Sequence, residues 1–189
     1  VLNHDMTLKR VAGSDDRVAD LTYGEVRRLT LGTDADGTSI PIPTLEEVLT
    51  EAAGRIKLLL DLKPYGAGEP LAREVVRLVQ EQGMEEEVFI QSFESRVLRQ
   101  IRELAPEIRI GQIMYFALGD LSALDVDFYT VEQIMVTKPF VDRAHAAGRE
   151  VWVWTVNGRN NLKEVLKFKV DSIITDDPAL AQSMVDIDW

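Results

Sequence analysis

The chain has 189 residues, of which 46% are hydrophobic and 28% are charged, a balance typical of a globular protein with a substantial core. Its 32 acidic and 21 basic residues give a net charge of −11, a field that repels phosphate backbones, so we expect no nucleic-acid partner. The sequence contains no cysteine, which excludes disulfides and thiolate metal sites, and no apolar run of about eighteen residues that could span a membrane.

The first quarter of the chain predicts two helices separated by loops. Thr22 with Glu25, and Thr44 with Glu47, each form the Thr-x-x-Glu pattern of a capping box, which marks the start of a helix. In chain order we expect a strand end at Val1–His4, a polar loop at Asp5–Asp20, a helix at Leu21–Leu31, a turn-rich loop at Gly32–Ser39 and a helix at Leu45–Ala53.

After residue 54 the hydrophobic pattern alternates regularly between strand and helix. The predicted strands are Arg55–Lys63, Val88–Phe93, Arg109–Met114, Phe128–Val131, Glu150–Val156 and Val170–Thr175. The predicted helices are Pro70–Gln82, Ser95–Leu104, Lys138–Ala147, Asn160–Phe168 and Pro178–Val185, and residues 115–125 are ambiguous. Strands that alternate with helices through short loops indicate βαβ units and a parallel sheet.

Two α/β architectures fit this alternation. A closed (β/α)8 barrel of the TIM type has eight strands and about 250 residues, so this chain is short of it by two βα units. An open doubly wound sheet usually shows a glycine-rich first turn, and neither a GxGxxG nor a Walker sequence occurs here.

The strand that ends in LLLDLKP, residues 58–64, places Asp61 and Lys63 two positions apart. Side chains alternate along a strand, so both point to the same side. A carboxylate and an ammonium at the carboxyl end of a buried strand lie where α/β folds place their chemistry. A simple ion pair at a strand end accounts for the two residues equally well.

Four segments, together with this strand, resemble glycerophosphodiester phosphodiesterases. The segments are NHDMTLKR at 3–10, IPTLEEVL at 42–49, IQSFESRVLRQI at 90–101 and VWTVNGRNNLKEVLKFKVDSIITDDP at 153–178. The resemblance covers essentially the whole chain in order. It implies a TIM barrel that hydrolyses glycerophosphodiesters to an alcohol and glycerol phosphate. The implied site holds two histidines and a divalent ion, Mg or Ca, bound by three carboxylates.

The resemblance also implies that the domain over residues 1–189 is partial. The family's first histidine, in a His-Arg-Gly strand, and two metal carboxylates, in a Glu-x-Asp strand, precede its His-Asp motif. This sequence begins three residues before that motif and lacks an initiator methionine. We therefore expect the natural protein to start upstream and the first two barrel strands to be absent from this chain. We also expect the hydrolytic activity of residues 1–189 alone to be severely reduced.

By the resemblance, three polar residues carry the chemistry. His4 matches the family's second histidine, the general acid that protonates the leaving alcohol. Asp61 matches the third metal ligand, although the family usually has the longer glutamate there. Lys63 matches a lysine that binds the phosphate and stabilises its developing charge. Asp5 is expected to orient its neighbour rather than to bind metal.

Aromatic residues are expected to line the mouth of the site. Trp154 matches a tryptophan that packs on the glycerol moiety of the substrate, and Phe93 is expected on the opposite wall. Trp152 is assigned to the barrel core. Gln91 and Ser92 are weaker candidates for polar substrate contacts.

The remaining candidates are assigned structural roles. His145, in a predicted helix and far from any strand end, is expected on the helix surface or in packing. Asp176 and Asp177 read as a turn and N-cap before the last helix.

The leading hypothesis is therefore a metal-dependent hydrolase of small glycerophosphodiesters. One alternative is a catalytically inactive barrel remnant that serves as a binding or interaction module through its open sheet edges. Another is a phosphoinositide-type phospholipase, which would require additional cationic contacts that an acidic chain does not offer.

Overall fold

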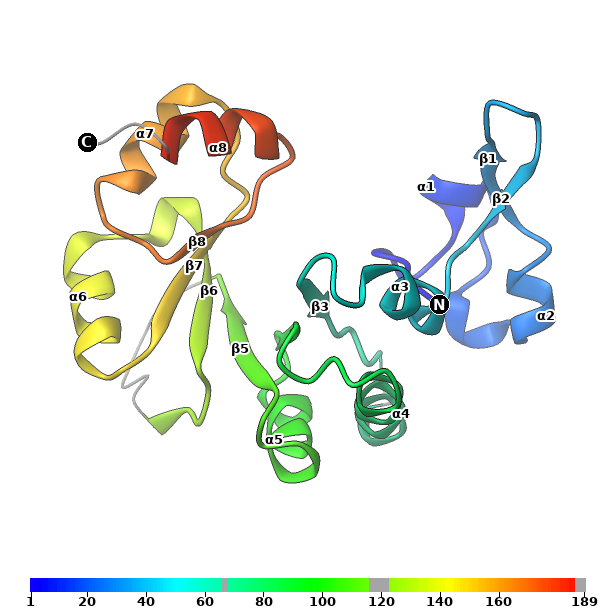
Figure 1. Cartoon of the computed structure of the whole chain (residues 1–189), viewed down its shortest axis with the longest axis horizontal. Helices are drawn as coiled ribbons and strands as arrows, with labels where there is room; N and C mark the ends of the chain where they lie inside the picture. Colours follow the sequence, from blue (N-terminus) through cyan, green and yellow to red (C-terminus); the bar gives the residue numbers. More distant parts are fainter. Residues whose placement is uncertain (66–67, 116–122, 186–189) are drawn as a thin grey trace. The chain divides into compact units, whose positions relative to one another are not determined.

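A computed structural model describes residues 1–65, 68–115 and 123–185 (Figure 1). The chain forms two compact units. The first comprises residues 1–56 and 77–84, and the second comprises residues 57–76 and 85–189. None of the described helices is long and apolar enough to cross a membrane.

The first unit combines short helices with a β-hairpin. Its elements include α1 (Lys9–Ala12), η1 (Val18–Asp20), α2 (Tyr23–Val26), β1 (Thr30–Thr33), β2 (Ser39–Pro41) and α3 (Leu45–Ala52). Strands β1 and β2 pair antiparallel. Leu8, Val26 and Ile42 form a small buried core to which neighbouring aliphatic side chains contribute further contacts. This unit thus folds around its own apolar cluster.

Both predicted capping boxes are present in this unit, although one helix is shorter than expected. The hydroxyls of Thr22 and Thr44 each accept a hydrogen bond from the backbone N–H three residues on, and the glutamate there bonds back. The predicted helix Leu21–Leu31 is wrong beyond its first turn, because Thr30 begins a hairpin strand instead. The Thr30 hydroxyl donates to the carbonyl of Ile40 on β2 at 3.2 Å.

Three further predictions for this unit are wrong, the first being the polar loop Asp5–Asp20, which contains α1 and η1. Val1–His4 forms no strand, and the backbone N–H of Leu2 donates to the Pro43 carbonyl at 2.9 Å. The expected loop Gly32–Ser39 is a turn only in its middle, where Asp34 Oδ1 accepts from two backbone N–H groups. Its ends belong to β1 and β2, so pairing between them overrides the turn-rich composition.

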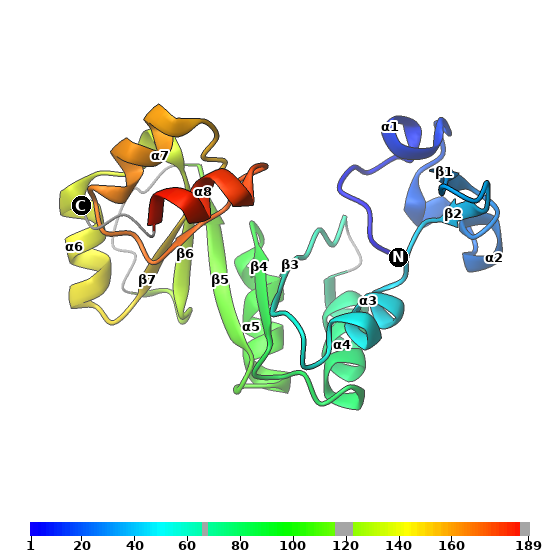
Figure 2. The same cartoon turned by 45° about the horizontal axis from the view of Figure 1, so that its top comes forward.

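The second part of the chain is an α/β structure whose elements follow the predicted order closely (Figure 2). The elements are β3 (Leu58–Asp61), α4 (Gly68–Glu81), β4 (Val88–Ser92), α5 (Ser95–Leu104), β5 (Arg109–Met114), β6 (Phe128–Glu132), η3 (Gln133–Met135), α6 (Lys138–Ala146), β7 (Glu150–Trp154), α7 (Arg159–Leu166), β8 (Ser172–Ile173) and α8 (Pro178–Val185). Strands β3 to β8 form one six-stranded parallel sheet in sequential order, which confirms the predicted topology. The ambiguous residues 115–125 lie largely outside the described residues.

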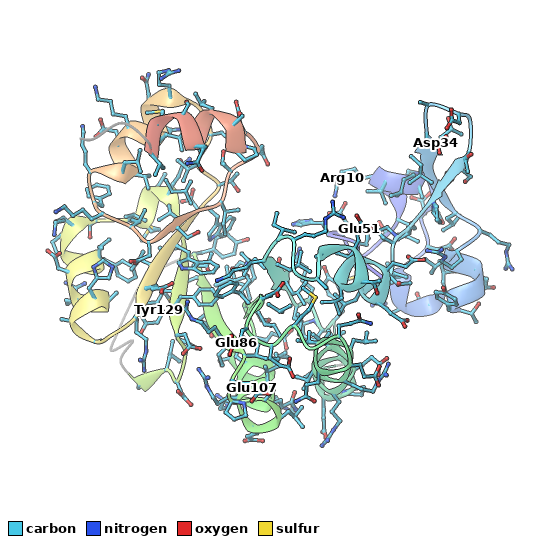
Figure 3. All side chains as sticks on the ribbon, viewed as in Figure 1. Arg10, Asp34, Glu51, Glu86, Glu107 and Tyr129 are labelled. Carbon is cyan, nitrogen blue, oxygen red and sulfur yellow. The ribbon has the colours of Figure 1, made fainter. Side chains whose placement is uncertain are left out.

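One face of the sheet packs against the connecting helices. Helix α5 lies beside β4 and β5, and α6 lies beside β7 (Figure 1). Tyr129 of β6, labelled in Figure 3, is buried on this face, with its ring centroid 6.2 Å from that of Phe140 on α6. Side chains alternate along a strand, so those that do not face the helices lie on the opposite face of the sheet, which we call the inner face.

Aromatic rings fill the amino-terminal half of the inner face. Phe128 and Trp152 stack with their ring centroids 4.0 Å apart, and the Phe89 ring meets Trp152 edge to face at 5.2 Å. Gly111 lies under this stack, because a Cβ atom there would come within 2.0 Å of the Phe128 ring. Trp152 is buried, as its assignment to the core predicts.

Candidate active site

The ion pair at the end of β3 has the geometry that strand alternation predicts. Lys63 Nζ lies 3.2 Å from Asp61 Oδ2, on the inner face at the carboxyl end of the strand. The two side chains are 20% and 31% exposed, so the pair is partly shielded while a small molecule can still reach it. Leu62 between them is buried on the other side of the strand.

Ser92 positions the segment that carries Lys63. Its hydroxyl donates to the carbonyl of Leu62 at 2.7 Å and accepts from the backbone N–H of Glu94 at 3.1 Å. Its side chain is fully buried. Ser92 thus ties the end of β3 to the end of β4, and the suggestion that it contacts substrate is wrong because its hydroxyl is committed to these two bonds.

Gln112 stabilises the turn after β4 in a similar way. Its Nε2 donates to the carbonyls of Ser92 and Phe93 at 3.1 and 3.0 Å. Sequence reasoning missed this residue. The available signal was an amide side chain in the middle of the otherwise apolar strand Arg109–Met114.

Gln91 is the nearest polar neighbour of Asp61 across the sheet. The two residues are register partners on β4 and β3, so their side chains share the inner face. Gln91 is buried, and within residues 1–65, 68–115 and 123–185 its Oε1 atom has no hydrogen-bond partner. A buried amide oxygen without a partner is costly, so Gln91 retains its place as a candidate polar contact.

Three aromatic rings stand together at the carboxyl ends of β4, β5 and β7, and we call them the aromatic platform: Phe93, Tyr115 and Trp154. Phe93 and Tyr115 stack with centroids 4.9 Å apart, and each meets Trp154 edge to face, at 6.3 and 5.5 Å. The structure thus brings together the two predicted wall residues. It adds Tyr115, which the ambiguity of residues 115–125 concealed although it continues the alternation of β5.

His4 belongs to the first unit and contacts its neighbour Asp5. His4 Nδ1 lies 2.8 Å from Asp5 Oδ1, while Asp5 Oδ2 accepts from Arg10 Nε, also at 2.8 Å (Arg10 is labelled in Figure 3). The hydrogen bond from Arg10, followed by that from His4, lowers the pKa of the Asp5 carboxyl to about 2. Asp5 is therefore ionised at neutral pH and can only accept, so His4 Nδ1 carries the hydrogen of this bond.

His145 and the two late aspartates have structural contacts. His145 Nε2 lies 2.8 Å from Asp171 Oδ2, which also accepts from the backbone N–H of Val151 at 2.7 Å. The prediction that His145 lies on the helix surface is confirmed, since it is exposed on α6. The prediction that it lies far from any strand end is wrong, since its partner Asp171 directly precedes β8. Asp176 bonds Asn157, and Asp177 Oδ1 accepts from the Leu180 N–H as an N-cap does.

The described residues do not by themselves complete a metal centre. No group of three or more His, Asp or Glu side chains within these residues could share an ion. Asp61 offers one carboxylate, and its Oδ2 is engaged by Lys63. Hard divalent cations require six or more oxygen ligands, several of which can be water, so a single carboxylate does not fit a tightly bound ion.

Comparisons with known proteins agree on one family. Residues 1–180 match the family model described as "Glycerophosphoryl diester phosphodiesterase family". The chain belongs to this family. A glycerophosphodiester phosphodiesterase of Caldanaerobacter subterraneus is 27% identical over 98% of this chain and 79% of its own length.

Solved structures of the family show the same fold. An Oleispira antarctica phosphodiesterase, solved in complex with the product sn-glycerol-3-phosphate, superposes with a TM-score of 0.89 and 23% identity over 98% of this chain and 78% of that one. A glycerophosphodiester phosphodiesterase of Agrobacterium tumefaciens gives a TM-score of 0.77 at 23% identity, over 96% and 79% of the two chains. The chain thus has the α/β fold of the TIM type, and its curled six-stranded sheet is a half-barrel.

Proposed function

We propose that this protein hydrolyses glycerophosphodiesters to an alcohol and glycerol phosphate. The residues that we propose for catalysis and binding are Asp61 and Lys63 at the end of β3, and His4. The observation that carries the proposal is the family match over residues 1–180. The half-buried pair of Asp61 and Lys63, at the carboxyl end of a parallel strand, supports it, because active sites of this fold lie at that end.

Lys63 is the group that meets the phosphate. An ammonium on a strand end attracts the negative diester against the overall charge of −11. It also stabilises the charge that grows on the non-bridging oxygens as the bond to the alcohol breaks. Asp61 holds Lys63 at 3.2 Å and so fixes where that positive charge lies.

His4 supplies the proton for the departing alcohol. The P–O bond to the alcohol breaks, and its oxygen takes a proton from Nε2 of His4. Asp5 holds Nδ1 at 2.8 Å and thereby orients the ring and selects its tautomer. The nucleophile is water or the 2-hydroxyl of glycerol, and its proton passes to a base that corresponds to the family's other histidine.

By the family resemblance the reaction would use Mg or Ca, which Asp61 would help to hold together with two further carboxylates. Such an ion would polarise the phosphate. We expect the 189-residue chain alone to hold the ion weakly, because it contributes one carboxylate of the three.

The proposal is tested with the complete gene product and a panel of glycerophosphodiesters, measured by release of glycerol phosphate with and without a chelator. We expect hydrolysis that the chelator abolishes and added Mg or Ca restores. Absence of glycerol phosphate from every diester would overturn the proposal. That result would instead support the alternative of a catalytically inactive interaction module, which the comparisons do not favour.

A further inference from the structure

An amide side chain closes the turn that carries His4 and Asp5. Asn3 Nδ2 donates to the backbone carbonyl of Asp5 at 2.7 Å and to that of Thr7 at 3.1 Å. The two bonds use both hydrogens of the amide, and the side chain is partly buried. Asn3 therefore holds together the two backbone carbonyls on either side of Met6.

The chain before and after this turn is anchored to other parts of the first unit. The backbone N–H of Leu2 donates to the Pro43 carbonyl at 2.9 Å, and the Met6 carbonyl accepts from the N–H of Val18 at 3.1 Å. These bonds fix the backbone on both sides of the proposed general acid. The Asn3 amide spans the interval between the two anchors, so it acts on the part of the turn that they do not hold.

The orientation of the His4 ring depends on the backbone of this turn. The imidazole is 74% exposed, so packing contributes little to its orientation. Its Nδ1 lies 2.8 Å from Asp5 Oδ1, and Asp5 Oδ2 accepts from Arg10 Nε at the same distance. A shift of the Asp5 backbone would move its carboxylate away from both partners. The bond from Asn3 to the Asp5 carbonyl opposes such a shift.

We propose that Asn3 is a positioning residue for the general acid: its amide fixes the turn so that Asp5 orients the His4 imidazole. The inference rests on the proposed function, which assigns the proton transfer to His4. Proton transfer requires the acid within hydrogen-bonding reach of the leaving oxygen, and a displacement of about 1 Å can lower a rate about 10²-fold. The pKa of Asp5, lowered to about 2, agrees with a carboxylate whose two partners are held in place.

The first test is NMR of the 189-residue chain with Asn3→Leu, which puts an uncharged side chain of similar size, without a donor, in place of the amide. Imidazole nitrogen shifts measure the tautomer of His4, and a carboxyl-carbon titration measures the pKa of Asp5. We expect the variant to lose the preference for the Nδ1–H tautomer and to raise the pKa of Asp5 from about 2 toward its ordinary value of 3.8. Both quantities unchanged, with circular dichroism like that of the parent, would overturn the inference.

Two further variants separate positioning from a general effect on folding. Asp34→Ala is the matched control, because Asp34 Oδ1 likewise holds two backbone groups of one turn, the N–H groups of Asp36 and Thr38 at 3.0 and 2.8 Å. Asp34 lies in the hairpin turn, away from Arg10 (Figure 3), so its loss should leave both NMR signals unchanged. An equal change in Asp34→Ala would contradict a role specific to Asn3. Asn3→Ala, which removes the amide without adding bulk, should act as Asn3→Leu does and replaces it if that variant does not fold.

A double-mutant cycle with the complete gene product measures whether Asn3 acts through His4. We expect Asn3→Leu to lower kcat about tenfold or more and to change KM less than about twofold, because Lys63 still binds the phosphate. In the His4→Gln background the same change should lower kcat less than about twofold, because the ring that Asn3 positions is absent. Equal losses in the two backgrounds would overturn the inference. If the parent hydrolyses no diester, the proposed function fails, and the two NMR signals still decide whether Asn3 positions His4.

Discussion

At the scale of single residues, the carboxylates of this chain act by fixing cations. Asp5 holds His4 and Arg10, and Asp61 holds Lys63, each at about hydrogen-bonding distance. Exposed ion pairs contribute little to stability, so we expect their effect to be on orientation. This applies most to His4, whose imidazole is 74% exposed.

Removing the His4 imidazole should abolish most of the activity. In the complete gene product, His4→Gln is expected to lower kcat by about 10²- to 10⁴-fold, because the leaving alkoxide then has no general acid. His145→Gln is the matched control, since that imidazole contacts Asp171 before β8. A His4→Gln enzyme within about tenfold of the parent would refute the role of His4.

The depressed pKa of Asp5 predicts how the first unit responds to acid. Its carboxyl has a pKa of about 2 in the folded chain against an ordinary value of 3.8, so ionised Asp5 favours folding above pH 3.8. That contribution is lost as the pH falls from about 4 to about 2.

A carboxyl-carbon NMR titration measures this directly. We expect Arg10→Gln to raise the pKa of Asp5 toward its ordinary value, because Arg10 makes the largest contribution to the shift. Arg17→Gln, in the same segment, should leave it unchanged. A pKa of Asp5 that does not respond to Arg10→Gln would rule out this pair as the cause.

At the scale of elements, the ends of the strands are tied to one another by side chains that face the helices. Ser92 joins β4 to the carbonyl of Leu62 beyond β3, and Gln112 on β5 holds the carbonyls of Ser92 and Phe93. The positions of the candidate site residues therefore depend on hydrogen bonds on the opposite face of the sheet. These bonds hold the backbone next to Lys63, beyond the last residue of β3.

The close approach of Gly111 to Phe128 makes β5 sensitive to a single methyl group. Gly111→Ala would place its Cβ about 2 Å from the ring, so Phe128 and Trp152 must shift. We expect a loss of about 1–3 kcal/mol in the free energy of unfolding, measured by urea denaturation. Gly24→Ala, within α2 and with open space around it, is the control and should be neutral or stabilising. Equal effects of the two changes would contradict this packing.

At the scale of the molecule, the described strands form a half-barrel, and Asp61 is the carboxylate that we propose for the metal site. Titration of the 189-residue chain with Mg or Ca, followed by calorimetry, should therefore show weak binding, in the millimolar range or above, and its turnover of glycerophosphocholine should be very low. Asp61→Asn should remove what binding there is, whereas Asp34→Asn in the hairpin turn should not. Tight binding, or robust turnover by residues 1–189 alone, would refute this account of the site.

The sequence alone predicted the order of strands and helices after residue 54 and the shared face of Asp61 and Lys63. These depend on local rules, namely hydrophobic periodicity, capping boxes and the alternation of side chains along a strand. It did not determine the hairpin at Thr30, because pairing with Ile40 overrides the helical pattern.

Which side chains contact one another across strands is known only from the tertiary structure. The aromatic platform joins Phe93, Tyr115 and Trp154 from three strand ends, and Ser92 bonds Leu62 thirty positions earlier. Such contacts depend on the register between strands, which no local pattern encodes.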